Sequence, residues 1–306
     1  MQNFDDLVKY ASSFGTNKVA VAFPHHEVIF KALHVIKEKN IAEPILIGDA
    51  EKIKKIADGI GYDLSDDEIV HETDSYGACE LAVQMIREQS ADLIMKGKVQ
   101  TYEFIKAVLK RDAGLRTGNL LSQVVVVHSP VYNRFMILSD GGVNIAPNLE
   151  QKAAISKNAI AVAHALGIEN PKLVALAAAE VVDENIPATV DAHELKMMNQ
   201  RGEITGAVID GPLALDTPLD SKAAEMKGID SPVAGVGDIF ISPTIECSNI
   251  LYRSILYFGK ARSGGITYGA KIPLIHMSRA DTVDAKVNST ALAVVVLHKM
   301  RENEQN

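Results

Sequence analysis

Short runs of Val, Ile, Leu and Ala alternate with longer amphipathic stretches along most of this 306-residue chain. Residues 18–23 (KVAVAF), 43–47 (EPILI) and 123–128 (QVVVVH) are clear examples of the runs. Unbroken apolar runs separated by helical stretches are typical of parallel strands that helices cover on both faces. We therefore predict an α/β fold built from doubly wound parallel sheets.

The strand–helix pattern restarts after residues 140–147, and a chain of this length fits two domains. We place domain I at residues 1–146 and 285–306 and domain II at residues 147–284. The last helix is expected to return to domain I, because it directly follows the final strand of domain II. Ligands of open parallel sheets bind beyond the carboxyl ends of the strands. The loops after strands, and a cleft between the two domains, are therefore where we expect chemistry.

Composition excludes several classes of partner. The net charge is −8, with 31 basic and 39 acidic residues. No Lys/Arg cluster supplies the basic surface that nucleic acid or an anionic membrane requires. No apolar run reaches the ~18 residues of a membrane span, and the first residues are acidic where a signal peptide is basic. We expect a cytoplasmic protein that binds small molecules.

Cysteine content fits the same location. Cys79 and Cys247 are the two cysteines, far apart and without metal-ligand spacing. Two thiols in so long a chain suit a reducing compartment, where we expect each to be a small buried apolar residue. A disulfide between them remains an alternative.

The most informative segment follows an apolar run that ends at residue 277. Ser278 and Asp281 have the spacing of a capping box at the start of the final helix, at about residue 281. Helix N-termini bind anions, and Arg279 would add a planar fork of donors that matches phosphate. Asp281 and Asp284 lie on one helix face. A capped helix with a solvated polar face is the alternative interpretation.

Two further strand ends carry charge. Asp210 and Asp216 flank a Gly-Pro turn after the strand at 206–209, and paired carboxylates can share acid and base work. Lys96 and Lys98 follow the strand at 93–95 just before a helix, and could hold phosphate there. The spacing is not that of a P-loop. A capping carboxylate and solvated lysines are the alternatives.

Other loops carry polar residues without a complete motif. Arg116, in RDAGLRTG, could bring positive charge to the same cleft or lie on a solvated face. Residues 139–147 hold two adjacent glycines and are expected to form the crossover between domains. Residues 242–249 form another strand-to-helix loop. His25 and His26 follow the first strand without ligand spacing, which favours ordinary polar loop residues. No GxGxxG or GxSxG motif occurs.

Taken together, these segments resemble the phosphotransacetylase/phosphotransbutyrylase family of phosphate acyltransferases, and its butyryl branch more than its acetyl branch. The resemblance runs from about residue 18 to residue 297. It is carried by MKGKVQT, LRTG, SDGGVNIAP, VIDGPLALD, SPTIECSN, and HMSRAD followed by an acid and KVNS. VIDGPLALD and HMSRAD together are its most specific part.

The resemblance implies the reaction acyl-CoA + phosphate ⇌ acyl phosphate + CoA. It also implies two α/β domains of the isocitrate/isopropylmalate dehydrogenase type and a homodimer. Coenzyme A is then a substrate, and neither a tightly bound cofactor nor a metal is expected. One departure from the acetyl branch is Gly142, where those enzymes usually have Ala.

The resemblance also assigns residue roles. Ser278 and Arg279 match the Ser-Arg pair that lies beside the CoA thiol and the phosphate. Asp284 matches the proposed base for the thiol, although the acetyl branch has its acid one residue further on, and Asp281 is a rival. The complete predicted substrate-binding set is Arg279, Lys96, Lys98, Thr101, Arg116, Asn144, Asp210 and Asn249.

Three other functions stay open from the residues alone. One is a phosphate acetyltransferase, since acyl-chain preference depends on a pocket that the sequence does not define. Another is a dehydrogenase of the same fold, in which Asp210, Asp216 and Asp238 would hold Mg²⁺. The third is a sensor that binds acyl-CoA without turnover.

Overall fold

The computed structural model describes residues 1–111, 114–276, 278 and 280–305. The chain divides into two compact units, each made of two separate segments. Unit 1 comprises Met1–Asn3 and Leu120–Ser263, and unit 2 comprises Phe4–Asn119 and Gly264–Asn306.

Unit 2 contains a sheet in which neighbouring strands run in the order β3-β2-β1-β4-β11-β10. The pairs from β3 to β11 are parallel, and β11 pairs antiparallel with β10. Strands β1, β2 and β4 are buried along almost their whole length, as their unbroken apolar runs predict. The strands are β1 (Lys18–Ala22), β2 (Glu43–Gly48), β3 (Glu68–His71), β4 (Leu93–Lys96), β10 (Arg262–Tyr268) and β11 (Leu274–Ile275).

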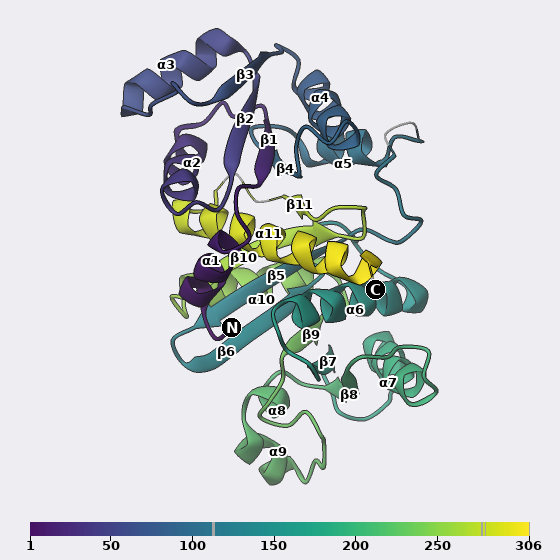
Figure 1. Ribbon diagram of the computed structural model, residues 1–306. Coiled ribbons are helices and arrows are strands. Elements are labelled where there is room, and N and C mark those ends of the chain that lie inside the picture. Colours follow the sequence, from purple (N-terminus) through teal and green to yellow (C-terminus); the bar gives the residue numbers. More distant parts are fainter. Residues whose placement is uncertain (112–113, 277, 279, 306) are drawn as a thin grey trace. The chain divides into compact units, whose positions relative to one another are not determined.

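Helices cover both faces of this sheet. Figure 1 shows α2 and α3 to one side of β1 and β2, and α4 and α5 to the other. The last helix, α11, packs against α1 and α2, so the end of the chain belongs to the same unit as its beginning. The helices are α1 (Phe4–Ser12), α2 (Glu27–Glu38), α3 (Ala50–Ile60), α4 (Ser75–Arg87), α5 (Thr101–Leu109) and α11 (Val283–Gln305).

Unit 1 contains the strands β5-β6-β9-β7-β8 in that order. Its core is apolar and gathers around the fully buried Phe240 of β9. The strands are β5 (Ser122–Ser129), β6 (Tyr132–Ser139), β7 (Lys172–Leu176), β8 (Val208–Leu213) and β9 (Ile239–Ile241). The helices are α6 (Leu149–Ala165), α7 (Pro187–Gln200), α8 (Asp216–Leu219), α9 (Ser221–Lys227) and α10 (Ile245–Tyr257).

The sheets are mixed, which corrects the prediction of wholly parallel ones. β5 and β6 form an antiparallel hairpin in which Ser129 pairs with Tyr132. Two residues, Pro130 and Val131, connect these strands. A link that short cannot return the chain to the start of a parallel neighbour, so the pair must be antiparallel. The spacing of the two apolar runs carried this information in the sequence.

The same hairpin explains where the units divide. β6 pairs in parallel with β9, and β9 pairs with β7, so the hairpin belongs to the sheet of unit 1. The chain therefore enters unit 1 near Leu120 rather than near residue 147, and it leaves after Ser263. Strand pairing partners that are distant in sequence decide this boundary, whereas the loop at 140–147 lies inside unit 1.

Both cysteines are free thiols. Cys79 is buried, as expected, and burial raises its pKa to about 12. Cys247 is exposed, which corrects the expectation of a second buried apolar residue. No helix in the described part of the chain is long and apolar enough to cross a membrane.

Candidate active site

Three loops of unit 2 follow the carboxyl ends of adjacent parallel strands. They come after β1, β4 and β11, and β4 pairs in parallel with each of the other two. The loops lead into α2, α5 and α11. Strand ends and helix N-termini meet at such a place, which is where open α/β sheets bind their ligands.

A pocket of about 120 Å³ lies among these loops. Three of the residues predicted from the sequence, Lys96, Lys98 and Ser278, line it together. The complete lining is His26, Ile29, Lys96, Gly97, Lys98, Ser278 and Lys286. Lys96, Lys98 and Lys286 are the lysines of this lining, so the pocket lies among cationic side chains.

Lys96 occupies the last position of β4 and is 6% exposed. Its Nζ donates to the carbonyl of Val99 at 2.9 Å, so the side chain bends along the loop that follows the strand. Lys98, two residues later, is exposed. The pocket therefore combines one buried and one solvated lysine from a single loop.

Gly97, between the two lysines, lies directly against another loop. A Cβ at this position would collide with the carbonyl oxygens of Ala22 and Phe23. The Gly97 amide donates to Ala22 at 2.9 Å, and the Lys98 amide donates to Phe23 at 2.8 Å. The absence of a side chain thus lets the loop after β4 bond to the end of β1.

Ser278 lies in a turn before α11 rather than at its N-cap. The Ser278 amide donates to the Asp281 carboxylate at 2.8 Å. The first turn is instead capped by Thr282, whose Oγ1 accepts the Ala285 amide at 3.1 Å. The helix begins at Val283, which corrects the predicted start near residue 281.

Lys286 lies in the first turn of α11 and is 7% exposed. Its Nζ donates to the Ser278 carbonyl at 3.3 Å. Burial lowers the pKa of Lys286, and the Asp281 carboxylate opposes this in part. The ammonium therefore lies close to the serine that the sequence marks for chemistry.

His276 lies behind the pocket wall. Its Nδ1 is 3.1 Å from the Thr267 hydroxyl, and its Nε2 is 3.2 Å from the Thr101 hydroxyl. Burial, followed by the nearby Lys96 ammonium, lowers the pKa of His276 to about 4. The ring is therefore neutral near pH 7, and it ties the start of α5 to the end of β11. Thr101, predicted to bind substrate, is engaged in this link.

The other predicted residues of unit 2 lie around this centre. Asp284 is an exposed residue of α11, and its carboxylate accepts from Asn288 Nδ2 at 3.0 Å. Arg116 is exposed, and its backbone pairs with Ala270. Arg279 lies outside the described residues.

Asp210 belongs to unit 1 and lies within a strand, which corrects its placement in a turn. β8 continues through the Gly-Pro pair to Leu213. It is the edge strand, where a missing proline amide is tolerated. Asp210 is 4% exposed and contacts Lys196 Nζ at 2.7 Å and Ser231 Oγ at 2.6 Å. These contacts hold the Asp210 carboxylate in place within unit 1.

The other two acids considered for a metal are also paired. Asp216 contacts Lys227 at 2.7 Å, and Asp238 contacts Arg134 at 3.3 Å. Among the described residues, no three His, Cys, Asp or Glu side chains gather as a metal site would require.

Asn144 and Asn249 lie in neighbouring segments of unit 1. Asn144 Nδ2 donates to Asp140 at 2.6 Å and to the Leu121 carbonyl at 2.8 Å, which uses both of its amide hydrogens. Asn249, on α10, donates to the Gly141 carbonyl at 3.1 Å. Both amides stabilise the loop that follows β6.

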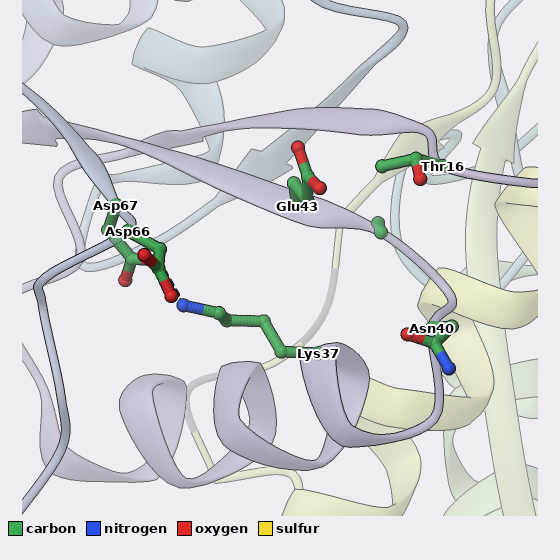
Figure 2. Close-up of a pocket in the computed structure, with 7 residues that line it drawn as sticks. Thr16, Lys37, Asn40, Glu43, Asp66 and Asp67 are labelled. Atoms are coloured by element: carbon green, nitrogen blue, oxygen red, sulfur yellow. Dashed lines mark hydrogen bonds and ion pairs between the residues drawn. The ribbon is translucent and has the colours of Figure 1, made fainter.

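A second hollow of unit 2, about 300 Å³ in volume, has a different charge (Figure 2). Lys37 is the lysine in its lining, and its Nζ is 2.6 Å from the Asp67 carboxylate. Figure 2 shows this side chain directed at Asp66 and Asp67. Since acids surround that cation, this hollow suits an anionic ligand much less than the lysine-lined pocket does.

Comparison with known proteins agrees with this chemistry. The family model described as "Phosphate acetyl/butaryl transferase" matches residues 68–294. The phosphate butyryltransferase of Clostridium acetobutylicum is 41% identical over 97% of this chain and 98% of its own length. The chain belongs to this acetyl/butyryl transferase family. It is an acyltransferase.

Two further relatives extend the comparison. A probable phosphate butyryltransferase of Bacillus subtilis is 41% identical over 94% of this chain and 96% of its own. The crystal structure of a branched-chain phosphotransacylase from Enterococcus faecalis V583 superimposes with a TM-score of 0.80 at 28% identity. The superposition covers 92% of this chain and 99% of the Enterococcus faecalis chain.

Two of the polar side chains that line the pocket, Lys286 and His26, were not predicted as site residues from the sequence. Lys286 is at helical spacing from Thr290 and Ala293, which are fully buried, but a lysine and a threonine do not form an apolar stripe that the sequence would reveal. His26 was tested only for metal spacing. Its Nδ1 accepts the Val28 amide at 3.2 Å as the N-cap of α2, and no sequence rule placed it beside the lysines.

Proposed function

We propose that this acyltransferase moves a butyryl or other short or branched acyl group between coenzyme A and inorganic phosphate. The observation that carries the proposal is the lysine-lined pocket at the carboxyl ends of β1, β4 and β11. Family membership supplies the reaction, and the named butyryl and branched-chain relatives support the choice of acyl group.

In the proposed reaction, Lys96 and Lys98 hold the phosphate and neutralise its charge. A phosphate oxygen attacks the thioester carbonyl, the C–S bond breaks, and CoA leaves as the thiolate. Ser278 Oγ accepts the Ala280 amide at 3.4 Å, which leaves its own O–H to donate to the developing oxyanion. Holding both substrates in contact is worth several kcal/mol in itself.

The leaving thiolate needs a proton, and in the reverse direction the thiol must lose one. We assign this transfer to Asp284. It lies on the same helix turn as Lys286, and the resemblance matches it to the acid that the family uses for the thiol. General acid–base assistance of this kind contributes about 10²–10⁴-fold to a rate. Asp281 is the less suitable acid, because its carboxylate already accepts the Ser278 amide.

Other parts of the proposal rest on the resemblance. They are the phosphate contact of Arg279, the substrate contacts of Thr101, Arg116, Asn144, Asp210 and Asn249, the homodimer, and the isocitrate/isopropylmalate dehydrogenase-like architecture. A cytoplasmic location is supported by the two free thiols, which suit a reducing compartment.

A dehydrogenase is not favoured, because Asp210, Asp216 and Asp238 each pair with a basic side chain. Acetyl rather than butyryl transfer is a question of pocket depth, where one methylene is worth only about 1–3 kcal/mol. Comparing kcat/KM for acetyl-, propionyl-, butyryl- and isobutyryl-CoA separates these substrates.

The proposal is tested by following CoA release from butyryl-CoA with a thiol reagent. We expect release that depends on added phosphate. A blank without butyryl-CoA corrects for the exposed Cys247 thiol. Equal release without phosphate would indicate a thioesterase. Binding of CoA without release would indicate a sensor.

A further inference from the structure

Lys286 occupies a position that folding alone does not favour. Only 7% of its surface is exposed. It also lies in the first turn of a helix, where the positive end of the helix dipole repels a cation. Buried lysines are rare unless paired. Among the described residues, its Nζ donates to the Ser278 carbonyl at 3.3 Å, and a neutral carbonyl does not cancel the charge.

The surroundings of Lys286 add positive charge. The pocket brings it together with Lys96 and Lys98 from the loop after β4. Asp281 is the acid that acts on it from the adjacent turn. That carboxylate also accepts the Ser278 amide at 2.8 Å, so its charge is shared.

Three lysines around one small pocket repel one another when the pocket is empty. A dianion between them removes this repulsion, and a desolvated ammonium binds an oxyanion more strongly than an exposed one. We infer that the Lys286 ammonium is a direct ligand of the phosphate in this pocket. This role rests on the proposed function above and adds to it the residue that binds phosphate from α11.

The geometry also sets the pH dependence of that contact. Burial lowers the pKa of Lys286, so the cation is present at low pH and is lost as the pH rises through the lowered pKa. The Asp281 carboxylate works against this loss, while the ammonium groups of Lys96 and Lys98, which line the same pocket, favour it. Phosphate binding therefore weakens at alkaline pH earlier than an ordinary lysine would require.

The test uses sulfate as the probe, because sulfate stays a dianion from neutral to alkaline pH. Sulfate binding to the full-length protein is measured by calorimetry, together with the KM for phosphate. Lys286→Gln removes the charge and keeps a donor for the Ser278 carbonyl. We expect its Kd for sulfate and its KM for phosphate to rise about 10- to 100-fold, as loss of a charged hydrogen bond implies.

Two controls separate ligand binding from a structural role. Lys299→Gln changes a half-buried lysine of the same helix, which pairs with Glu302, and should leave sulfate binding unchanged. Lys286→Arg keeps a charge that does not titrate. It should bind sulfate near neutrality and retain that binding at alkaline pH, where the wild-type protein loses it. This comparison remains decisive if Lys286→Gln does not fold.

Wild-type sulfate affinity in Lys286→Gln would overturn the inference, and so would identical pH profiles in wild type and Lys286→Arg. These outcomes differ from failure of the proposed function. An enzyme without phosphate-dependent CoA release would overturn the acyl transfer, while a sulfate site that depends on Lys286 would still stand.

Discussion

Asp281 and Asp284 are only three residues apart, yet their surroundings differ. Asp281 is buried and holds the turn that carries Ser278 through a 2.8 Å bond to its amide. Asp284 is exposed at the start of α11 and contacts Asn288. A proton-transfer group must reach solvent and substrate, whereas a turn-forming carboxylate must not move. These contacts favour Asp284 as the acid–base residue and Asp281 as its structural neighbour.

Asp284→Asn should lower kcat by about 10²–10⁴-fold with little change in the thermal unfolding temperature, because the new amide oxygen can still accept from Asn288 Nδ2 but cannot transfer a proton. Asp281→Asn should lower the unfolding temperature and raise the KM for phosphate, because it loosens the turn before α11. Steady-state kinetics and thermal melts check both variants. Full activity in Asp284→Asn together with loss of turnover in a folded Asp281→Asn would reverse the assignment.

His276 affects stability through its protonation. Its pKa is lowered to about 4 in the folded protein, against 6.5 in the unfolded chain. The unfolded state therefore binds more protons between these values, and stability falls as the pH drops from 6.5 to 4. Burial, rather than the two threonine contacts, keeps the ring neutral, because a threonine hydroxyl can also accept from a protonated ring nitrogen.

His276→Asn should remove this part of the pH dependence. The difference in free energy of unfolding between pH 7 and pH 4 should be smaller than in the wild type by about 3 kcal/mol. Urea titrations of both proteins at the two pH values measure it. An unchanged difference would mean that His276 is not held neutral by burial.

At the level of elements, the pocket depends on how closely one loop approaches another. Gly97 brings Lys96 and Lys98 against the end of β1, because the carbonyls of Ala22 and Phe23 occupy the space of a Cβ. Backbone atoms cannot turn aside as a flexible side chain can. The loop therefore has little freedom to accept a larger residue.

Gly97→Ala should destabilise the protein by about 1–3 kcal/mol, as overpacking does, and raise the KM for phosphate by displacing the two lysines. Gly59→Ala is the matched control, because this glycine lies in α3 with open space around its Cβ position. The control should be neutral or slightly stabilising. Equal behaviour of the two variants in chemical unfolding and kinetics would contradict the close-approach explanation.

The sequence predicted most of the elements because their apolar runs are long and local. It missed β10, whose Ser-Gly-Gly stretch lacks a β-branched run, and α1, which is short. It placed Asp210 in a turn because Gly-Pro usually breaks strands, whereas β8 is an edge strand that tolerates the pair. The differences at β10 and β8 follow from strand pairing that the local pattern does not encode.

At the scale of the whole molecule, unit 2 is assembled from residues 4–119 and 264–306. This discontinuity brings Lys96 and Lys98, from the first segment, to Ser278 and Lys286, from the second. Motif spacing identified Ser278 and the two earlier lysines, and resemblance joined them to one reaction. The sequence could not show that these residues meet in one pocket, or that Lys286 joins them, because almost 190 residues separate Lys98 from Lys286.

The most direct test of the central claim is to observe the acyl phosphate itself. The protein is mixed with butyryl-CoA and inorganic phosphate, and the reaction is followed by ³¹P NMR while released CoA is titrated. We predict a new acyl-phosphate resonance that grows in a one-to-one ratio with CoA and disappears when excess CoA drives the reaction back. Release of CoA without that resonance would contradict phosphate as the acyl acceptor.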